Sequence, residues 1–89
     1  MKLYEDIYFA QGEDAWEDIE EIDDLGAERF ARDLIDMFYA PGAHPCRQAA
    51  PWGEEDELYH LEDGFVLLVN RRIGSVGLTR VIDTGEDSP

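Results

Sequence analysis

The chain has 89 residues, of which 44% are hydrophobic and 11% are aromatic. This length supports one domain with one core and excludes two independently stable cores, and the apolar content excludes wholesale disorder. Twenty-two Asp and Glu residues stand against seven Lys and Arg residues, and the formal net charge of -15 excludes a surface that attracts nucleic acid or anionic lipid. Such a surface attracts basic proteins and cations instead.

The first expected element is a short strand over residues 2 to 9, where β-formers carry Leu3, Ile7 and Phe9 in partial alternation. From Glu13 to about Asp23, apolar residues recur three and four apart among acidic ones, which predicts an amphipathic helix. Its expected core positions are Ala15, Trp16, Ile19 and Ile22.

A second helix, beginning between residues 25 and 27, has the clearest periodic signal in the chain. Its apolar residues lie three or four apart as far as Phe38, and the Pro41-Gly42 pair stops it. Asp23 and Asp24 are unfavourable at the end of the first helix, because they face the negative end of its dipole. We therefore expect them to cap the start of the second helix, with Gly26 allowing the chain to turn.

Residues 41 to 53 hold three of the four prolines and predict an ordered connector anchored by Trp52. Strand-like segments follow at about residues 58 to 61, 65 to 70 and 76 to 82, and predict an antiparallel meander with turns at residues 62 to 64 and 70 to 74. The middle segment is apolar on both faces, which is typical of a central strand.

These elements predict an α+β fold in which two helices pack on a three- or four-stranded, mainly antiparallel sheet, in one domain spanning residues 1 to 89. Residues 84 to 89 are expected to form a frayed tail. The longest apolar run, residues 65 to 69, is too short to span a bilayer, and no basic stretch followed by an apolar one begins the chain. We therefore expect no membrane contact and a cytoplasmic protein.

Cys46 is the single cysteine, so an internal disulfide is excluded. Pairing of its thiol with His44 or His60 would lack an identifiable third group, and the surrounding negative charge disfavours the thiolate, so we expect Cys46 to be a small buried filler. A zinc site would need the same histidines together with carboxylates. The sequence also lacks a glycine-rich phosphate loop and a nucleophile motif, and therefore predicts neither enzyme activity nor a cofactor or metal.

The candidate partner-binding residues lie in two acidic tracts. The first tract holds eight carboxylates, Glu13, Asp14, Glu17, Asp18, Glu20, Glu21, Asp23 and Asp24, and the second holds Glu54, Glu55, Asp56 and Glu57. As a helix, the first tract is about 18 Å long with about one charge per 2.2 Å, comparable with one per roughly 1.7 Å in duplex DNA. Glu5-Asp6 and Glu62-Asp63 would extend this track if they lay on the same side, and Arg71-Arg72 is expected to be an exposed turn or an internal partner for the acids.

In its size, its net charge and its acidic run from Glu13 to Asp24, the chain resembles, at the level of a class, the small acidic nucleic-acid mimics that phages and mobile elements use against restriction or CRISPR defences. The resemblance implies an inhibitor that binds the basic surface of a nucleic-acid-binding defence protein. It also implies that the inhibitor occludes a DNA-binding channel or a PAM-reading site. No direct contact with nucleic acid is expected.

Two other interpretations fit the same composition. A salt-adapted proteome, or a highly soluble small domain, has an acid excess and little Lys without any partner. An antitoxin or adaptor would use its helices to mask a basic partner. Residues 1 to 45 hold thirteen acids and three bases, whereas residues 46 to 89 hold nine and four, and this bias favours a directed surface. The oligomeric state stays open, including a dimer that buries a sheet edge.

Overall fold

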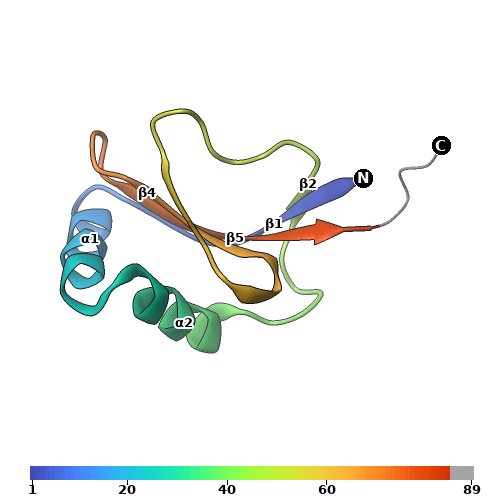
Figure 1. Ribbon diagram of the computed structural model, residues 1–89, viewed down its shortest axis with the longest axis horizontal. Helices are drawn as coiled ribbons and strands as arrows, with labels where there is room; N and C mark the ends of the chain where they lie inside the picture. The colour runs from blue at the N-terminus through green and yellow to red at the C-terminus, as the bar shows by residue number, and fades with distance from the viewer. Residues whose placement is uncertain (85–89) are drawn as a thin grey trace.

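The structure is a computed structural model that describes residues 1–84. Within these residues, two helices pack on one face of a five-stranded antiparallel sheet with the strand order β2-β1-β5-β4-β3 (Figure 1). The predicted α+β fold class is therefore confirmed, with more strands than expected. The elements are β1 (Lys2–Gln11), α1 (Glu13–Leu25), α2 (Ala27–Phe38), β2 (Cys46–Arg47), β3 (Glu57–His60), a 3-10 turn (Glu62–Gly64), β4 (Phe65–Asn70) and β5 (Ser75–Asp83).

Strands β3, β4 and β5 form the antiparallel meander that the sequence predicts. Its two turns use residues with positive φ, Asp63 and Gly64 in the first and Gly74 in the second. Every residue of β4 is buried, as expected for an interior strand covered on both faces, and β4 lies between β5 and the edge strand β3. Strand β1 pairs antiparallel with β5 from Lys2 to Gln11, so the two ends of the described chain meet inside the sheet.

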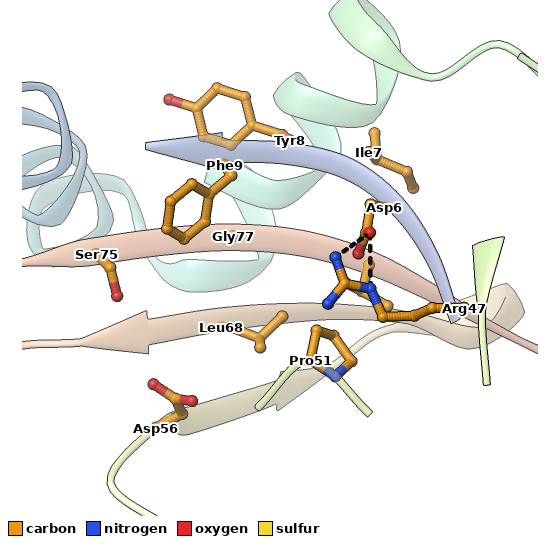
Figure 2. Close-up of a pocket in the computed structure, with 11 residues that line it drawn as sticks. Asp6, Ile7, Tyr8, Phe9, Arg47, Pro51, Asp56, Leu68, Ser75 and Gly77 are labelled. Atoms are coloured by element: carbon orange, nitrogen blue, oxygen red, sulfur yellow. Dashed lines mark hydrogen bonds and ion pairs between the residues drawn. The ribbon is translucent and has the colours of Figure 1, made fainter. Parts of the chain in front are cut away.

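A β-bulge in β1 changes the faces on which its side chains lie. The register between β1 and β5 shifts between Asp6 and Tyr8, which leaves Ile7 as the extra residue. Beyond the bulge, Tyr8 points toward the helices and Phe9 points to the opposite face of the sheet (Figure 2). The alternation predicted from the sequence therefore ends at the bulge.

The core lies between the helices and the sheet. It is built from side chains that are at least nine-tenths buried, among them Ala15, Ile19, Ile22, Phe30, Ala31, Leu34, Leu67, Val69, Val76 and Leu78. The apolar faces predicted for both helices are thus confirmed. The prediction that Trp16 is a core residue is wrong, because its side chain is 44% exposed and lies over Gly74 in the β4–β5 turn.

The helix junction differs from the prediction. Helix α1 continues to Leu25, so Asp23 and Asp24 lie inside its last turn and do not cap α2. The N-cap residue of α2 is Gly26, which has φ 95° and provides no side-chain cap. Its N–H donates to the Ile22 carbonyl at 2.9 Å. The buried Ile22 keeps the last turn of α1 helical in spite of the unfavourable charges.

The connector between α2 and β3 passes on the other side of the sheet from the helices (Figure 1). It contributes the short strand β2, which pairs with β1 at Tyr4 and Glu5. Trp52 packs edge-on against Tyr4 with the ring centroids 5.3 Å apart, which confirms its predicted anchoring role. Of the predicted frayed tail, residues 85–89 lie outside the described residues. No helix within residues 1–84 is long and apolar enough to cross a lipid bilayer.

Candidate functional site

Four carboxylates form an outward-facing row on α1, called here the α1 stripe: Glu13, Glu17, Glu20 and Asp24. All four are exposed, and they lie four, three and four residues apart, opposite the buried face of Ala15, Ile19 and Ile22. None of the four forms an ion pair or a side-chain hydrogen bond within residues 1–84. The stripe therefore presents negative charge to solvent without an internal partner.

One flank of α1, between its buried face and the α1 stripe, carries Asp14, Asp18 and Glu21, which are four and three residues apart. Asp18 contacts β1 on this flank. The Tyr8 hydroxyl donates a hydrogen bond to the Asp18 carboxylate. Burial, followed by this hydrogen bond and the nearby carboxylate charges, raises the pKa of Tyr8 far above its ordinary value of 10.0. The hydroxyl therefore stays protonated and holds α1 to the sheet.

Arg71, in the β4–β5 turn, joins the two acidic tracts. Its two terminal nitrogens donate to the Asp23 carboxylate at 2.7 and 3.0 Å, and its Nε donates to Glu57 at 2.9 Å. The hydrogen bonds from Arg71 lower the pKa of Asp23, and Asp23 in turn raises the pKa of Arg71 above its already high value. This bridge brings the end of α1 beside the start of β3, as the prediction of an internal basic partner anticipated.

The second tract is only partly available to a partner. Glu54 is exposed, and Glu55 pairs with Arg72. Asp56 accepts hydrogen bonds from the Gly53 N–H at 2.8 Å and from the Asn70 amide at 3.0 Å. Asp56 therefore fixes the connector to β4, and Glu54 is the carboxylate of this tract that has neither an ion pair nor a side-chain hydrogen bond within residues 1–84.

Neither predicted extension continues the row of free charge on α1. Glu5 is 3% exposed and faces Arg80 across the β1–β5 ladder, and Asp6 pairs with Arg47. Glu62 and Asp63 form the turn at the far end of β3, away from Glu57. The exposed acidic surface is thus concentrated on α1 and the beginning of the 54 to 57 tract.

The cysteine and the two histidines do not form a cluster. Cys46 is exposed on the edge strand β2, so the prediction of a buried filler is wrong. His60 lies on β3, at the opposite edge of the sheet, and His44 accepts the Ala40 N–H at 3.1 Å. Within residues 1–84, no three His, Cys, Asp or Glu side chains are grouped so as to hold a metal ion.

A hollow of about 540 Å³ lies on the sheet face opposite the helices. Figure 2 shows Phe9 and Leu68 pointing into it, with the Asp6–Arg47 pair at one end and Asp56 at the other. Arg47 donates to Asp6 at 2.6 and 2.9 Å, and Asp56 is held by the connector. These charged groups therefore fix the connector across the sheet.

Sequence reasoning missed an apolar groove of about 410 Å³ between α1 and α2. Leu25, Met37 and Phe38 line it and are all about half exposed or more. Met37 lies seven residues after Phe30 and three after Leu34, and Leu25 lies three residues after Ile22, so both residues extend the apolar stripes of their helices. This extension beyond the buried positions is the signal that could have marked the groove.

The most distinctive surface of the chain is therefore the carboxylate row on α1, with an apolar groove beside it. Arg71 and Trp16 hold that helix against the β4–β5 turn from the other side. Comparison of the chain with protein-family models, with curated protein sequences and with solved structures found no match in any of the three.

Proposed function

We propose that the chain is an acidic inhibitor that binds the basic surface of a nucleic-acid-binding protein and imitates DNA there, blocking a CRISPR or restriction complex of the host. It acts by binding, without catalysis or a cofactor. The observation that carries the proposal is the α1 stripe, in which four exposed carboxylates have no internal partner within residues 1–84. The class resemblance of the acidic run from Glu13 to Asp24 supports the same target.

Apart from Glu13, which lies in the first turn where the helix dipole favours a carboxylate, the α1 stripe works against the stability of its own helix. Like charges three or four residues apart destabilise a helix by about 0.2–0.5 kcal/mol per pair, and the α1 stripe contains three such pairs of neighbouring carboxylates. Asp24 also lies at the negative end of the helix dipole. Charges that oppose folding and form no internal contact are typical of a surface kept for binding.

The spacing of these charges suits a groove that binds nucleic acid. Of the eight α1 carboxylates, only Asp23 is ion-paired within residues 1–84. Seven uncompensated charges over about 18 Å give about one per 2.6 Å. This density lies between that of duplex DNA, one per roughly 1.7 Å, and that of a single strand, one per roughly 3.4 Å.

A mimic must also hold its charges in place before it binds, because ordering them later costs affinity. Three contacts fix α1: the buried face of Ala15, Ile19 and Ile22, the Tyr8 hydrogen bond to Asp18, and the two hydrogen bonds from Arg71 to Asp23. The carboxylates of the stripe are therefore carried on a rigid support.

The direct test replaces the stripe in the variant Glu13→Gln, Glu17→Gln, Glu20→Gln, Asp24→Asn. Asp18 is left intact, because it accepts the Tyr8 hydroxyl. The control variant Glu28→Gln, Asp36→Asn, Glu62→Gln, Asp63→Asn removes four exposed charges from α2 and the β3–β4 turn. Asn tolerates the positive φ of residue 63.

Each tagged protein is used to capture partners from host lysate, and the affinity of the captured protein is then measured. We expect the wild type and the control to capture the same basic protein, and the stripe variant to bind it at least about tenfold more weakly, a loss of about 1.4 kcal/mol or more. Equal binding by the stripe variant and the control would show that total charge, and not the stripe, attracts the partner.

A further inference from the structure

The groove between α1 and α2 exposes apolar side chains that the core does not need. Its floor is formed by the buried Phe30 and Leu34, and its walls carry Leu25, Met37 and Phe38. Met37 is 66% exposed, more than any other large hydrophobic side chain in residues 1–84. Contiguous apolar side chains left in contact with water are typical of surfaces that bind another molecule.

The rim of this groove is acidic. Asp18 and Glu21 lie on the α1 side, Asp33 lies on the α2 side, and no Lys or Arg within residues 1–84 lines it. Arg29 approaches Asp33 at 3.6 Å, and both side chains of that pair are exposed. An apolar floor with an anionic rim complements a ligand that is both apolar and cationic. Apolar side chains of the ligand would lose water as they contact the floor, and the carboxylates of the rim would favour a positively charged ligand over a negatively charged one.

Tyr8 of β1 contacts both walls of the groove. The Tyr8 hydroxyl is bonded to Asp18 on α1, and the Tyr8 ring packs against the Phe38 ring of α2 with the centroids 5.3 Å apart. Gly26 sets the angle between the helices at the other end. The groove is therefore formed before any ligand enters, which lowers the entropic cost of binding.

We propose that this groove binds a Lys- and Arg-rich amphipathic helix of the partner protein, whose apolar side chains contact Leu25, Met37 and Phe38 while its basic side chains meet Asp18, Glu21 and Asp33. A helix fits because its apolar residues recur on one face and its basic residues flank them, matching an apolar floor between two acidic walls. This inference rests on the proposed function, since it names how the basic partner is recognised beside the α1 stripe.

The test uses a synthetic Leu/Lys amphipathic helix as the probe and the full chain as the receptor. Met37→Lys places a positive charge in the groove, and Ile73→Lys makes the same change at a side chain that is 61% exposed in the β4–β5 turn, outside the groove. We expect Met37→Lys to weaken binding of the peptide at least about tenfold, and Ile73→Lys to weaken it less than about threefold, because exposed charges outside a contact are largely screened.

A Leu/Lys peptide of the same composition in scrambled order is the control for charge alone, and we expect it to bind at least about tenfold more weakly than the amphipathic one. Equal binding of the two peptides, equal effects of the two lysine variants, or absence of binding would overturn the inference. Met37→Ala, which adds no charge, supplies a second groove variant whose expected effect is also a loss of affinity.

Methyl resonances of Leu25 and Met37, and amide resonances of the α1 stripe, distinguish this inference from the proposed function. Shifts confined to Glu13, Glu17, Glu20 and Asp24 on peptide addition would overturn the groove and leave the stripe as the binding surface. If the captured partner loses affinity for the stripe variant but not for Met37→Lys, the groove inference fails alone. If neither variant loses affinity, both fail.

Discussion

The indole of Trp16 packs on the β4–β5 turn directly over Gly74. Gly74 has φ 72°, and a Cβ atom there would lie 2.5 Å from Nε1 and 2.6 Å from Cε2 of Trp16. The turn therefore needs glycine for two reasons, its backbone conformation and the indole above it. Gly42 has a similar φ of 76° but no atom within 4 Å of the corresponding position.

These two glycines form a matched pair for mutagenesis. We expect Gly42→Ala to cost about 1–2 kcal/mol of unfolding free energy from its positive φ alone, and Gly74→Ala to cost at least about 1 kcal/mol more, because Trp16 must move. Urea unfolding of both variants measures the difference. Equal losses would mean that Trp16 does not pack on the turn.

The raised pKa of Tyr8 predicts a loss of stability in alkali. Because the folded pKa lies above the unfolded value of about 10, the contribution of this group is complete below pH 10 and is lost as the pH rises beyond it. One proton changes the unfolding free energy by at most about 1.4 kcal/mol per pH unit. Tyr8→Phe should remove this part of the slope above pH 10, as measured by urea unfolding, and an unchanged slope would contradict the partly buried hydrogen bond to Asp18.

Helix α1 depends on contacts outside itself, and Arg71 is the clearest of them. Asp23 has a lowered pKa, so its contribution to stability is present above its unfolded pKa and is lost as the pH falls through the folded value. Arg71→Gln should lower the unfolding midpoint at neutral pH and speed amide exchange in the last turn of α1. Arg72→Gln removes a pair with Glu55 only and should leave that exchange unchanged. Similar exchange rates in the two variants would show that Arg71 does not hold the helix.

The elements with strong periodicity could be predicted from the sequence, and those fixed by pairing could not. Helix α2 and strand β4 have the expected limits because their apolar patterns determine which faces are buried. Strand β2 has only two residues in a Pro-rich segment, and its existence depends on backbone pairing with β1. The bulge at Ile7 likewise follows from the register with β5, which no local pattern indicates.

The same division holds for the candidate site. The eight carboxylates of α1 could be predicted as one helical tract, because residue spacing alone places them. Which of these carboxylates stay free and which find a partner depends on contacts with β1 and the β4–β5 turn. Asp18 accepts a hydrogen bond from Tyr8, Asp23 accepts hydrogen bonds from Arg71, and the α1 stripe faces solvent. The groove beside them could not be foreseen either, since it arises from the angle between two helices at Gly26.

At the scale of the whole molecule, the net charge of -15 produces self-repulsion that dissolved salt screens. Lowering the salt from about 1 M to about 0.01 M lengthens the Debye screening distance from about 3 Å to about 30 Å. We expect the domain to stay folded at the lower value, because its core and the Arg71 bridge hold α1 in place. Circular dichroism over this range provides the check, and loss of helix at low salt would favour adaptation to a saline proteome over a directed surface.

We propose that the α1 stripe occupies the surface of its partner that binds nucleic acid. In the most direct measurement, the chain competes with labelled duplex DNA for the captured partner at moderate salt. The fluorescence anisotropy of the DNA reports how much of it stays bound. We expect the wild-type chain to displace the DNA completely, and the stripe variant to displace it only at concentrations at least about tenfold higher. A ternary complex in which the partner holds the chain and the DNA together would contradict it.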